Sequence, residues 1–156
     1  MERNRKMWDI EVLSFISAVL LIVLFGYTAV AKLLDYEKFV FQMRLSPAPM
    51  VAWAAPVLGW FVPLIEIVIV AALCFERWRV AGLHASLFLL LIFEVYIVTM
   101  LLSGSKLPCT CGGIVSKMSW TQHLWFNLAF MLVAAAPVVL KKSQTQMNIQ
   151  RVRKRE

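Results

Sequence analysis

The chain has 156 residues, of which 61% are hydrophobic, and its formal net charge is +7. Its apolar residues form blocks that are too long for the core helices of a soluble domain, so the composition excludes an ordinary soluble enzyme. The charge does not indicate nucleic-acid binding, because most of the Lys and Arg lie in terminal stretches that anionic lipid headgroups attract, and no aromatic residue is interleaved with the C-terminal charges.

Four apolar blocks are long enough to cross a membrane. A helix needs about 20 apolar residues to span the hydrocarbon, and backbone polar groups cannot stay unpaired in lipid, so such blocks must be helical. The blocks cover residues 12–31, 51–75, 80–102 and 120–140. The sequence therefore predicts an all-α integral membrane protein, with one four-helix bundle over residues 12–140 and basic tails at residues 1–11 and 141–156.

The first block follows basic residues, as the apolar core of a signal peptide does, and it ends in small residues at Ala29 and Ala31. Its apolar core exceeds the roughly 7 to 15 residues of a cleaved signal peptide. We therefore expect this block to remain as the first helix of the bundle.

Lys and Arg are distributed unevenly between the two sides of the predicted bundle. The two tails and the second loop together hold eleven of them, whereas the first and third loops hold five. The positive-inside rule then predicts that both termini lie in the cytoplasm. The bundle itself is expected in the inner membrane of a bacterium. The first and third loops are expected on the outer, periplasmic side.

The first external loop carries an apolar stripe. Tyr36, Phe39, Val40 and Met43 recur at the spacing of one helix face, which predicts a short interfacial helix. Such a helix either roofs the bundle near the third loop or connects two spans while keeping its apolar side in lipid.

Glu66 lies inside the second apolar block, where a carboxylate facing lipid would cost on the order of 2.5–3.5 kcal/mol. Helical spacing places this acid on one face with small residues and prolines, and we expect that face to turn into the bundle. The residues of the predicted face are Ala52, Pro56, Gly59, Pro63 and Glu66.

Glu94 in the third block and Asn127 in the fourth lie at similar depth, each about two turns from the outer end of its helix. A Glu94–Asn127 hydrogen bond, or a small polar cavity shared with Glu66, would satisfy these groups. The acids either relay protons when a nearby redox group changes state or hold the helices together as internal polar contacts.

Two basic side chains are placed near the outer side. Lys32 either snorkels to the interface, pairs with an internal acid or raises the thiolate fraction of a nearby cysteine. His123 is close enough in sequence to the third loop to serve there as a base, whereas His84 is expected at the inner end as a packed or interfacial histidine.

The third loop contains Cys109 and Cys111, preceded by Pro108 and followed by Gly112 and Gly113. Outside the cytoplasm thiols meet an oxidising compartment. A disulfide across one intervening residue closes a small, strained ring, which suits disulfide exchange better than stapling. The glycines would let the backbone approach a partner closely.

Other interpretations of the cysteines remain open. A structural disulfide this short would remove little chain entropy, and a zinc site would want four ligands where only two thiolates and His123 are near, so no metal is predicted. The two cysteines could instead each pair with another protein, or be inert. Cys74, near the inner end of the second helix, is expected to be an ordinary small apolar residue.

The chain resembles the methylamine-utilisation MauE family, a branch of the DoxX-like four-helix membrane proteins. The resemblance rests on AVAKLLD at the end of the first helix, VPLIEIVIVAAL in the second and CTCGG in the third loop. It implies a redox-associated membrane protein that supports disulfide formation or electron transfer for an exported enzyme. The family residues that it carries over are Lys32, Glu66, Cys109, Cys111 and Gly113.

Together these features favour a thiol–disulfide redox protein whose external Cys-x-Cys pair exchanges with a periplasmic thioredoxin-like protein or a client. Quinone as an electron carrier rests on analogy with other four-helix thiol oxidases, and no other cofactor is indicated. One alternative is a non-catalytic membrane scaffold that assembles a respiratory or exported enzyme. Another is a small-molecule transporter that uses the internal acids.

Overall fold

The computed structural model describes residues 2–103 and 119–153 of the chain. In these ranges every regular element is a helix: α1 (Glu2–Leu34), α2 (Tyr36–Arg44), α3 (Pro49–Cys74), α4 (Arg79–Leu102) and α5 (Trp120–Arg153). Among the described residues, four spans are long and apolar enough to cross a membrane: Trp8–Leu34, Pro49–Cys74, Arg79–Leu102 and Trp120–Gln144. The predicted all-α, multi-pass membrane bundle and the short helix of its first loop are therefore confirmed.

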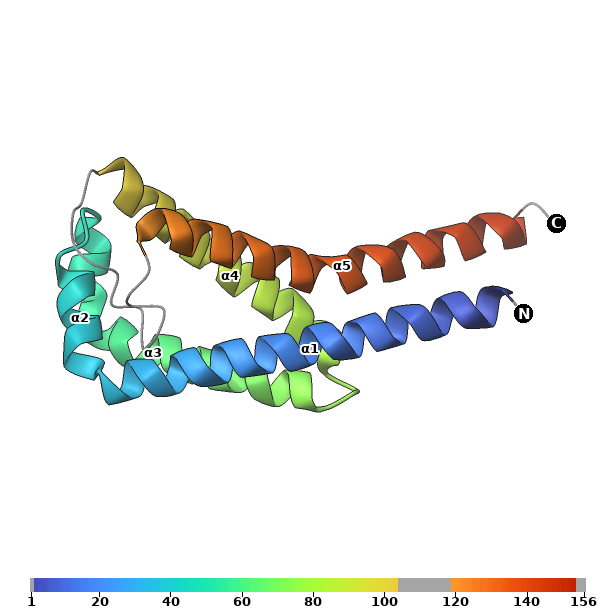
Figure 1. The fold of residues 1–156 in the computed structure, drawn as a ribbon, viewed down its shortest axis with the longest axis horizontal. Coiled ribbons are helices and arrows are strands. Elements are labelled where there is room, and N and C mark those ends of the chain that lie inside the picture. The colour runs from blue at the N-terminus through green and yellow to red at the C-terminus, as the bar shows by residue number, and fades with distance from the viewer. Residues whose placement is uncertain (1, 104–118, 154–156) are drawn as a thin grey trace.

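The helices place both termini at one end of the bundle and α2 at the other (Figure 1). We call these the terminal end and the α2 end. The α3–α4 turn faces the terminal end, and α1 and α5 extend past it as continuous helices. Residues 2–11 and 141–153 contain no Gly or Pro, and each added helical residue gains a backbone hydrogen bond, so nothing in these stretches ends the helices.

The main core joins α1, α3, α4 and α5 in the half of the bundle nearest the terminal end. Leu21, Phe25 and Leu73 are among its fully buried side chains. A Cβ at Gly82 would lie 2.9 Å from Cδ2 of Leu73, so α3 and α4 can meet this closely only because residue 82 is glycine.

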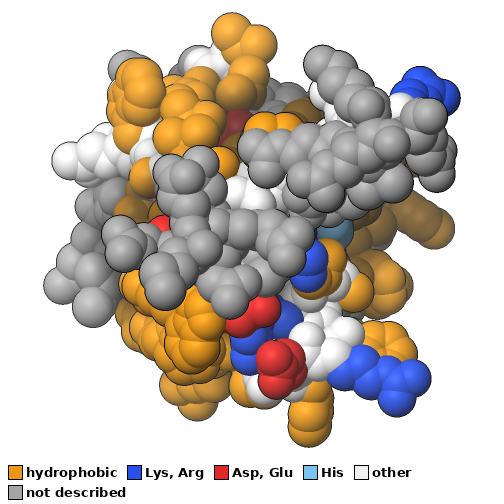
Figure 2. Space-filling view, turned by 90° about the vertical axis from the view of Figure 1, so that its right-hand side faces the viewer, with side chains coloured by type: hydrophobic (Ala, Val, Ile, Leu, Met, Phe, Trp, Pro, Cys, Tyr) orange, Lys and Arg blue, Asp and Glu red, His pale blue; other side chains and the backbone are white. Residues whose placement is uncertain are grey.

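The flanks of the bundle are apolar. Seen from the terminal end, charged side chains lie on the face toward the viewer and hydrophobic side chains gather around them (Figure 2). Val23, Val68 and Leu132 lie within the spans and are 65%, 60% and 66% exposed. Apolar surface of this extent would be unfavourable in water, and in a bilayer it faces the acyl chains.

The apolar side of α2 packs against the first half of α3. Phe39, Val40 and Met43 are buried in a cluster with Ala55. A Cβ at Gly59 would lie 2.6 Å from Cγ2 of Val40, so this glycine sets how closely the two helices approach. The alternative in which α2 keeps its apolar side in lipid is therefore wrong.

The buried face of α3 differs from the predicted one near its start. The buried residues follow one another at steps of four, four and three: Ala55, Gly59, Pro63 and Glu66. Pro56 is exposed. The reason is that α2 covers the side of α3 that carries Ala55 and Gly59, and a residue one position further along points about 100° away. The predicted face is correct from Gly59 onward and wrong at Pro56.

Candidate functional site

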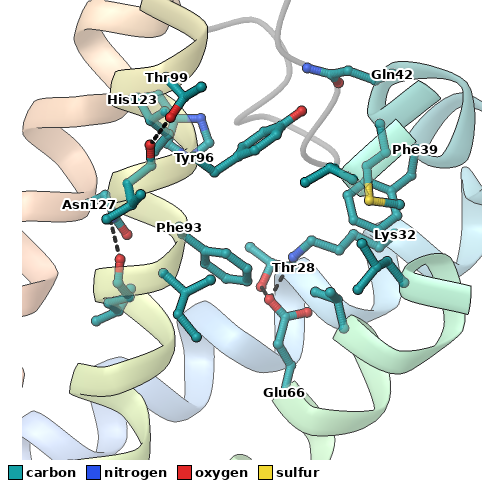
Figure 3. Close-up of a pocket in the computed structure, with 18 of the residues that line it drawn as sticks. Thr28, Lys32, Phe39, Gln42, Glu66, Phe93, Tyr96, Thr99, His123 and Asn127 are labelled. Carbon is teal, nitrogen blue, oxygen red and sulfur yellow. Dashed lines mark hydrogen bonds and ion pairs between the residues drawn. The ribbon is translucent and has the colours of Figure 1, made fainter. Parts of the chain in front are cut away.

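A cavity of about 380 Å³ lies at the α2 end, between α4 and α5 on one side and α1, α2 and α3 on the other (Figure 3). Its volume falls within the range of small-molecule sites, about 300–1,000 Å³. Most of its wall is apolar. The polar or titratable side chains in the wall are Thr28, Lys32, Gln42, Glu66, Tyr96, Thr99, His123 and Asn127.

The cavity contains a buried ion pair. Nζ of Lys32 lies 2.6 Å from Oε1 of Glu66, and the Oγ1 hydroxyl of Thr28 donates to the same oxygen at 3.1 Å. Lys32 is 4% exposed and Glu66 is fully buried. Of the three roles that the sequence leaves open for Lys32, pairing with an internal acid is confirmed.

Local sequence explains how these groups meet. Thr28 and Lys32 are four residues apart, so they stand one above the other on the face of α1 that also buries Phe25. Glu66 extends the buried face of α3, three residues after Pro63. Proline lacks an N–H and frees the carbonyl four residues earlier, so the backbone of α3 is locally adjustable where it approaches α1.

Two aromatic rings flank the lysine. Nζ of Lys32 lies 5.8 Å from the ring centroid of Phe39, on α2, and 5.3 Å from that of Phe93, on α4. Both distances are within cation–π range. The pair is buried, and a low local dielectric strengthens its attraction.

One carboxylate oxygen of the pair is left over. No residue in the described ranges hydrogen-bonds to Oε2 of Glu66, although this atom is buried. A buried polar atom without a partner costs about 1–3 kcal/mol. The cavity beside it could hold a group that supplies the missing donor.

A second polar contact joins α4 to α5. Nδ2 of Asn127 donates to Oε2 of Glu94 at 2.6 Å and to the carbonyl of Leu90 at 2.9 Å. The predicted Glu94–Asn127 hydrogen bond is therefore confirmed. Asn127 shares the cavity wall with Glu66, whereas Glu94 is not part of that wall.

His123 is half-buried in the first turns of α5, and its side chain lines the cavity near Thr99 (Figure 3). His84 is exposed near the terminal end, where its Nδ1 lies 2.8 Å from the carbonyl oxygen of Val80. The two histidines are therefore at opposite ends of the bundle, as the sequence predicts.

The predicted thiol site, with Pro108, Cys109, Cys111, Gly112 and Gly113, lies outside the described residues. The helices on either side of it, α4 and α5, have their Leu102 and Trp120 ends at the α2 end of the bundle (Figure 1). Within the described ranges no group of three or more His, Cys, Asp or Glu could hold a metal ion.

Two parts of the site were not predicted from the sequence. Thr28 supplies a hydrogen bond to Glu66, and its signal is a hydroxyl one turn before Lys32, on the same helix face. Phe39 and Phe93 come from helices far apart in the chain and carry no local signal that they meet at Lys32.

Comparison with known proteins adds the family. A family model described as methylamine utilisation protein MauE matches residues 10–140. No curated protein and no solved structure gives a significant match. The matched range contains α2, α3, α4 and nearly all of the apolar parts of α1 and α5, so it includes every residue of the cavity wall. By this match over most of its length, the chain belongs to the MauE family.

Proposed function

We propose that this protein is an inner-membrane redox protein that exchanges disulfides with an exported partner through Cys109 and Cys111. A thiolate of the partner attacks one sulfur of the Cys109–Cys111 disulfide, and a mixed disulfide forms as the other sulfur leaves as a thiolate. The partner's second thiolate then resolves the mixed disulfide. The partner's dithiol is oxidised by two electrons, and the Cys109–Cys111 disulfide is reduced by the same two electrons.

The observation that carries this proposal is the position of the buried Lys32–Glu66 pair. The pair lies in the cavity at the α2 end, and the two helices that flank the cysteine segment, α4 and α5, have their adjoining ends at that same end. Buried ionisable groups inside a membrane bundle are expensive and usually mark functional sites. If the segment between these two helix ends carries the thiol pair to this site, proton-accepting groups are present in the same part of the bundle.

Each supporting residue has a role in the proposal. Glu66 and Lys32 act as a charge pair that accepts or returns a proton during exchange, with Glu94 and Asn127 as a second hydrogen-bonded pair across the cavity. His123, at the start of α5, serves as the base that ionises a thiol. Pro108, Gly112 and Gly113 shape the segment that carries the cysteines.

The proposal includes an orientation. With both termini in the cytoplasm, the α2 end faces the periplasm, where disulfides persist. The family description names methylamine utilisation, so an exported protein of that process is the first partner to test.

Alkylation of intact cells with a membrane-impermeant maleimide tests the orientation and the chemistry together. Cys74 is exposed at the terminal end of α3, so a Cys74→Ser background removes its signal. We expect labelling of Cys109 and Cys111 from outside after mild reduction and none after oxidation. Labelling only after permeabilisation would show the opposite orientation, and labelling that is insensitive to redox state would exclude a dithiol–disulfide cycle.

The scaffold alternative predicts a different result for a double Cys109→Ser, Cys111→Ser variant. A scaffold keeps its partner bound when the thiols are lost, because its affinity comes from surface contacts. A thiol exchanger without its cysteines can no longer oxidise its partner, so the partner's thiols stay reduced. Co-purification of the partner and its thiol content, measured on the same sample, separate the two functions.

A further inference from the structure

The cavity at the α2 end presents hydrogen-bonding groups that the described residues do not use. Glu66 is fully buried in its wall, and Oε2 of this residue has no partner in residues 2–103 and 119–153. Lys32 has three N–H donors on Nζ, and one of them is used by Oε1 of Glu66. One acceptor and two donors of the same buried pair are therefore not used by the described residues.

The rest of the wall suits an aromatic ring. Phe39 and Phe93 lie near Lys32 on opposite sides of the cavity, and Tyr96 also lines it (Figure 3). Aromatic pairs prefer offset or edge-on arrangements with centroids about 4.5–7 Å apart, which a ring held between these side chains could adopt.

The cavity also reaches the lipid-facing surface. Ile92 and Val95 belong to its wall, and both are exposed on α4 within the span Arg79–Leu102. Both side chains are apolar, so a ligand that enters past them comes from the acyl-chain region rather than from water.

We propose that this cavity binds the ring of a lipid-soluble phenol or hydroquinone. One ring hydroxyl accepts a hydrogen bond from Nζ of Lys32 and donates a hydrogen bond to Oε2 of Glu66. A hydroxyl is the smallest group that does both, because it has one donor and two acceptor lone pairs. The ring lies against Phe39 and Phe93, and an alkyl substituent extends past Val95 into the bilayer.

Other lipid-soluble ligands fit these groups less well. A hydrocarbon leaves Oε2 of Glu66 without a donor. A fatty-acid carboxylate or a phospholipid phosphate has no donor when ionised and brings a negative charge beside Glu66, which the single positive charge of Lys32 already compensates. Binding of the phenol requires no electron transfer and does not depend on the thiol exchange proposed above.

Binding of paired probes to the purified full-length protein in detergent tests this proposal. The probes are decylhydroquinone and its dimethyl ether, which share the ring and the chain but differ in the O–H donors. Titration calorimetry against a detergent blank gives both affinities. We expect the hydroquinone to bind at least about tenfold more tightly, since the ether leaves Oε2 of Glu66 unpaired. Equal affinities, or no binding of either probe, would overturn the proposal.

A matched pair of variants locates the effect. In Glu66→Gln the amide N–H₂ replaces Oε2 and donates to either probe, so the preference should fall to less than about threefold. Glu76→Gln makes the same change at an exposed site in the α3–α4 turn and should keep the full preference. An unchanged preference in Glu66→Gln would contradict the assignment, and if that variant does not fold, the two probes on the unaltered protein still decide.

The double Cys109→Ser, Cys111→Ser variant separates this inference from the proposed function. It should bind decylhydroquinone with unchanged affinity, because neither cysteine takes part in the contacts to Lys32 and Glu66. If the thiol labelling experiment fails but this binding persists, only thiol exchange is excluded. If labelling succeeds but the probes bind equally, only the ligand assignment is excluded.

Discussion

Lys32 of α1 and Glu66 of α3 form a 2.6 Å ion pair from which water is nearly excluded. Replacing Lys32 by Met leaves the Glu66 carboxylate buried without its counter-charge. We expect the free energy of unfolding to fall by about 3–5 kcal/mol, measured by denaturation in detergent. The matched control is Lys38→Met, because Lys38 forms a 2.8 Å pair with Asp35 at an exposed site, where the loss should stay below about 1 kcal/mol.

Removing both charges tests the cause of that loss. The double Lys32→Met, Glu66→Leu variant has no unpaired charge, so it should regain most of the stability lost in Lys32→Met. If Lys32→Met is no less stable than Lys38→Met, the two groups of the internal pair are not both ionised in the folded protein.

Gly59 permits the close contact between α2 and α3. A Cβ at this position would lie 2.6 Å from Val40, whereas a Cβ at Gly26 would meet no atom within 4 Å. Gly59→Ala should therefore destabilise the protein by about 1–3 kcal/mol through overpacking. Gly26→Ala should be neutral or slightly stabilising, because alanine favours helix more than glycine does. Equal effects of the two changes in thermal unfolding would argue against the tight α2–α3 contact.

The Asn127–Glu94 hydrogen bond should appear as a coupling between α4 and α5. In a double-mutant cycle of Asn127→Ala and Glu94→Ala we expect a coupling of about 0.6–1.7 kcal/mol, as for other hydrogen bonds between membrane helices. Thr99→Ala is the comparison, since the Thr99 hydroxyl bonds to Val95 within α4. A cycle of Asn127 with Thr99 should show no coupling, and a zero value for both cycles would mean that the interhelical bond is not made.

His123 should affect thiol reactivity if it acts as a base. In His123→Gln we expect Cys109 and Cys111 to be alkylated several-fold more slowly at neutral pH, because less thiolate forms. The difference should vanish at a pH well above the thiol pKa, where the thiols ionise without help. His84→Gln, at the opposite end of the bundle, is the control and should leave the rate unchanged. Equal rates in both variants would remove His123 from the proposed mechanism.

The fold could be predicted from the sequence because a bilayer leaves few options. Long apolar blocks must be helical, and four of them in a chain of 156 residues leave room for one bundle and little else. The predicted buried face of α3 is wrong at Pro56, because α2 packs against that part of α3. Which side of α3 is covered by α2 is set by tertiary packing. The helical tails were not predicted as such, since polarity indicates where a span leaves the membrane but does not end a helix.

The candidate site was predicted in its parts rather than in its arrangement. Glu66 and Lys32 are conspicuous as charges in apolar spans, and the Glu94–Asn127 contact follows from equal depth along two helices. That Lys32 reaches Glu66, rather than the interface, depends on how α1 packs against α3. Phe39 and Phe93 belong to α2 and α4, so their positions beside Lys32 depend on how those helices pack, which no local pattern encodes.

The Lys32–Glu66 pair also constrains the order of membrane insertion. The two charges belong to the first and second spans, so the lysine enters the bilayer without its partner until α3 has followed. A lone charge there is unfavourable, and the two spans are stabilised when they meet as a helical hairpin. The N-terminal half of the chain, with α2 between its spans, is therefore expected to assemble during synthesis before α4 and α5 are added.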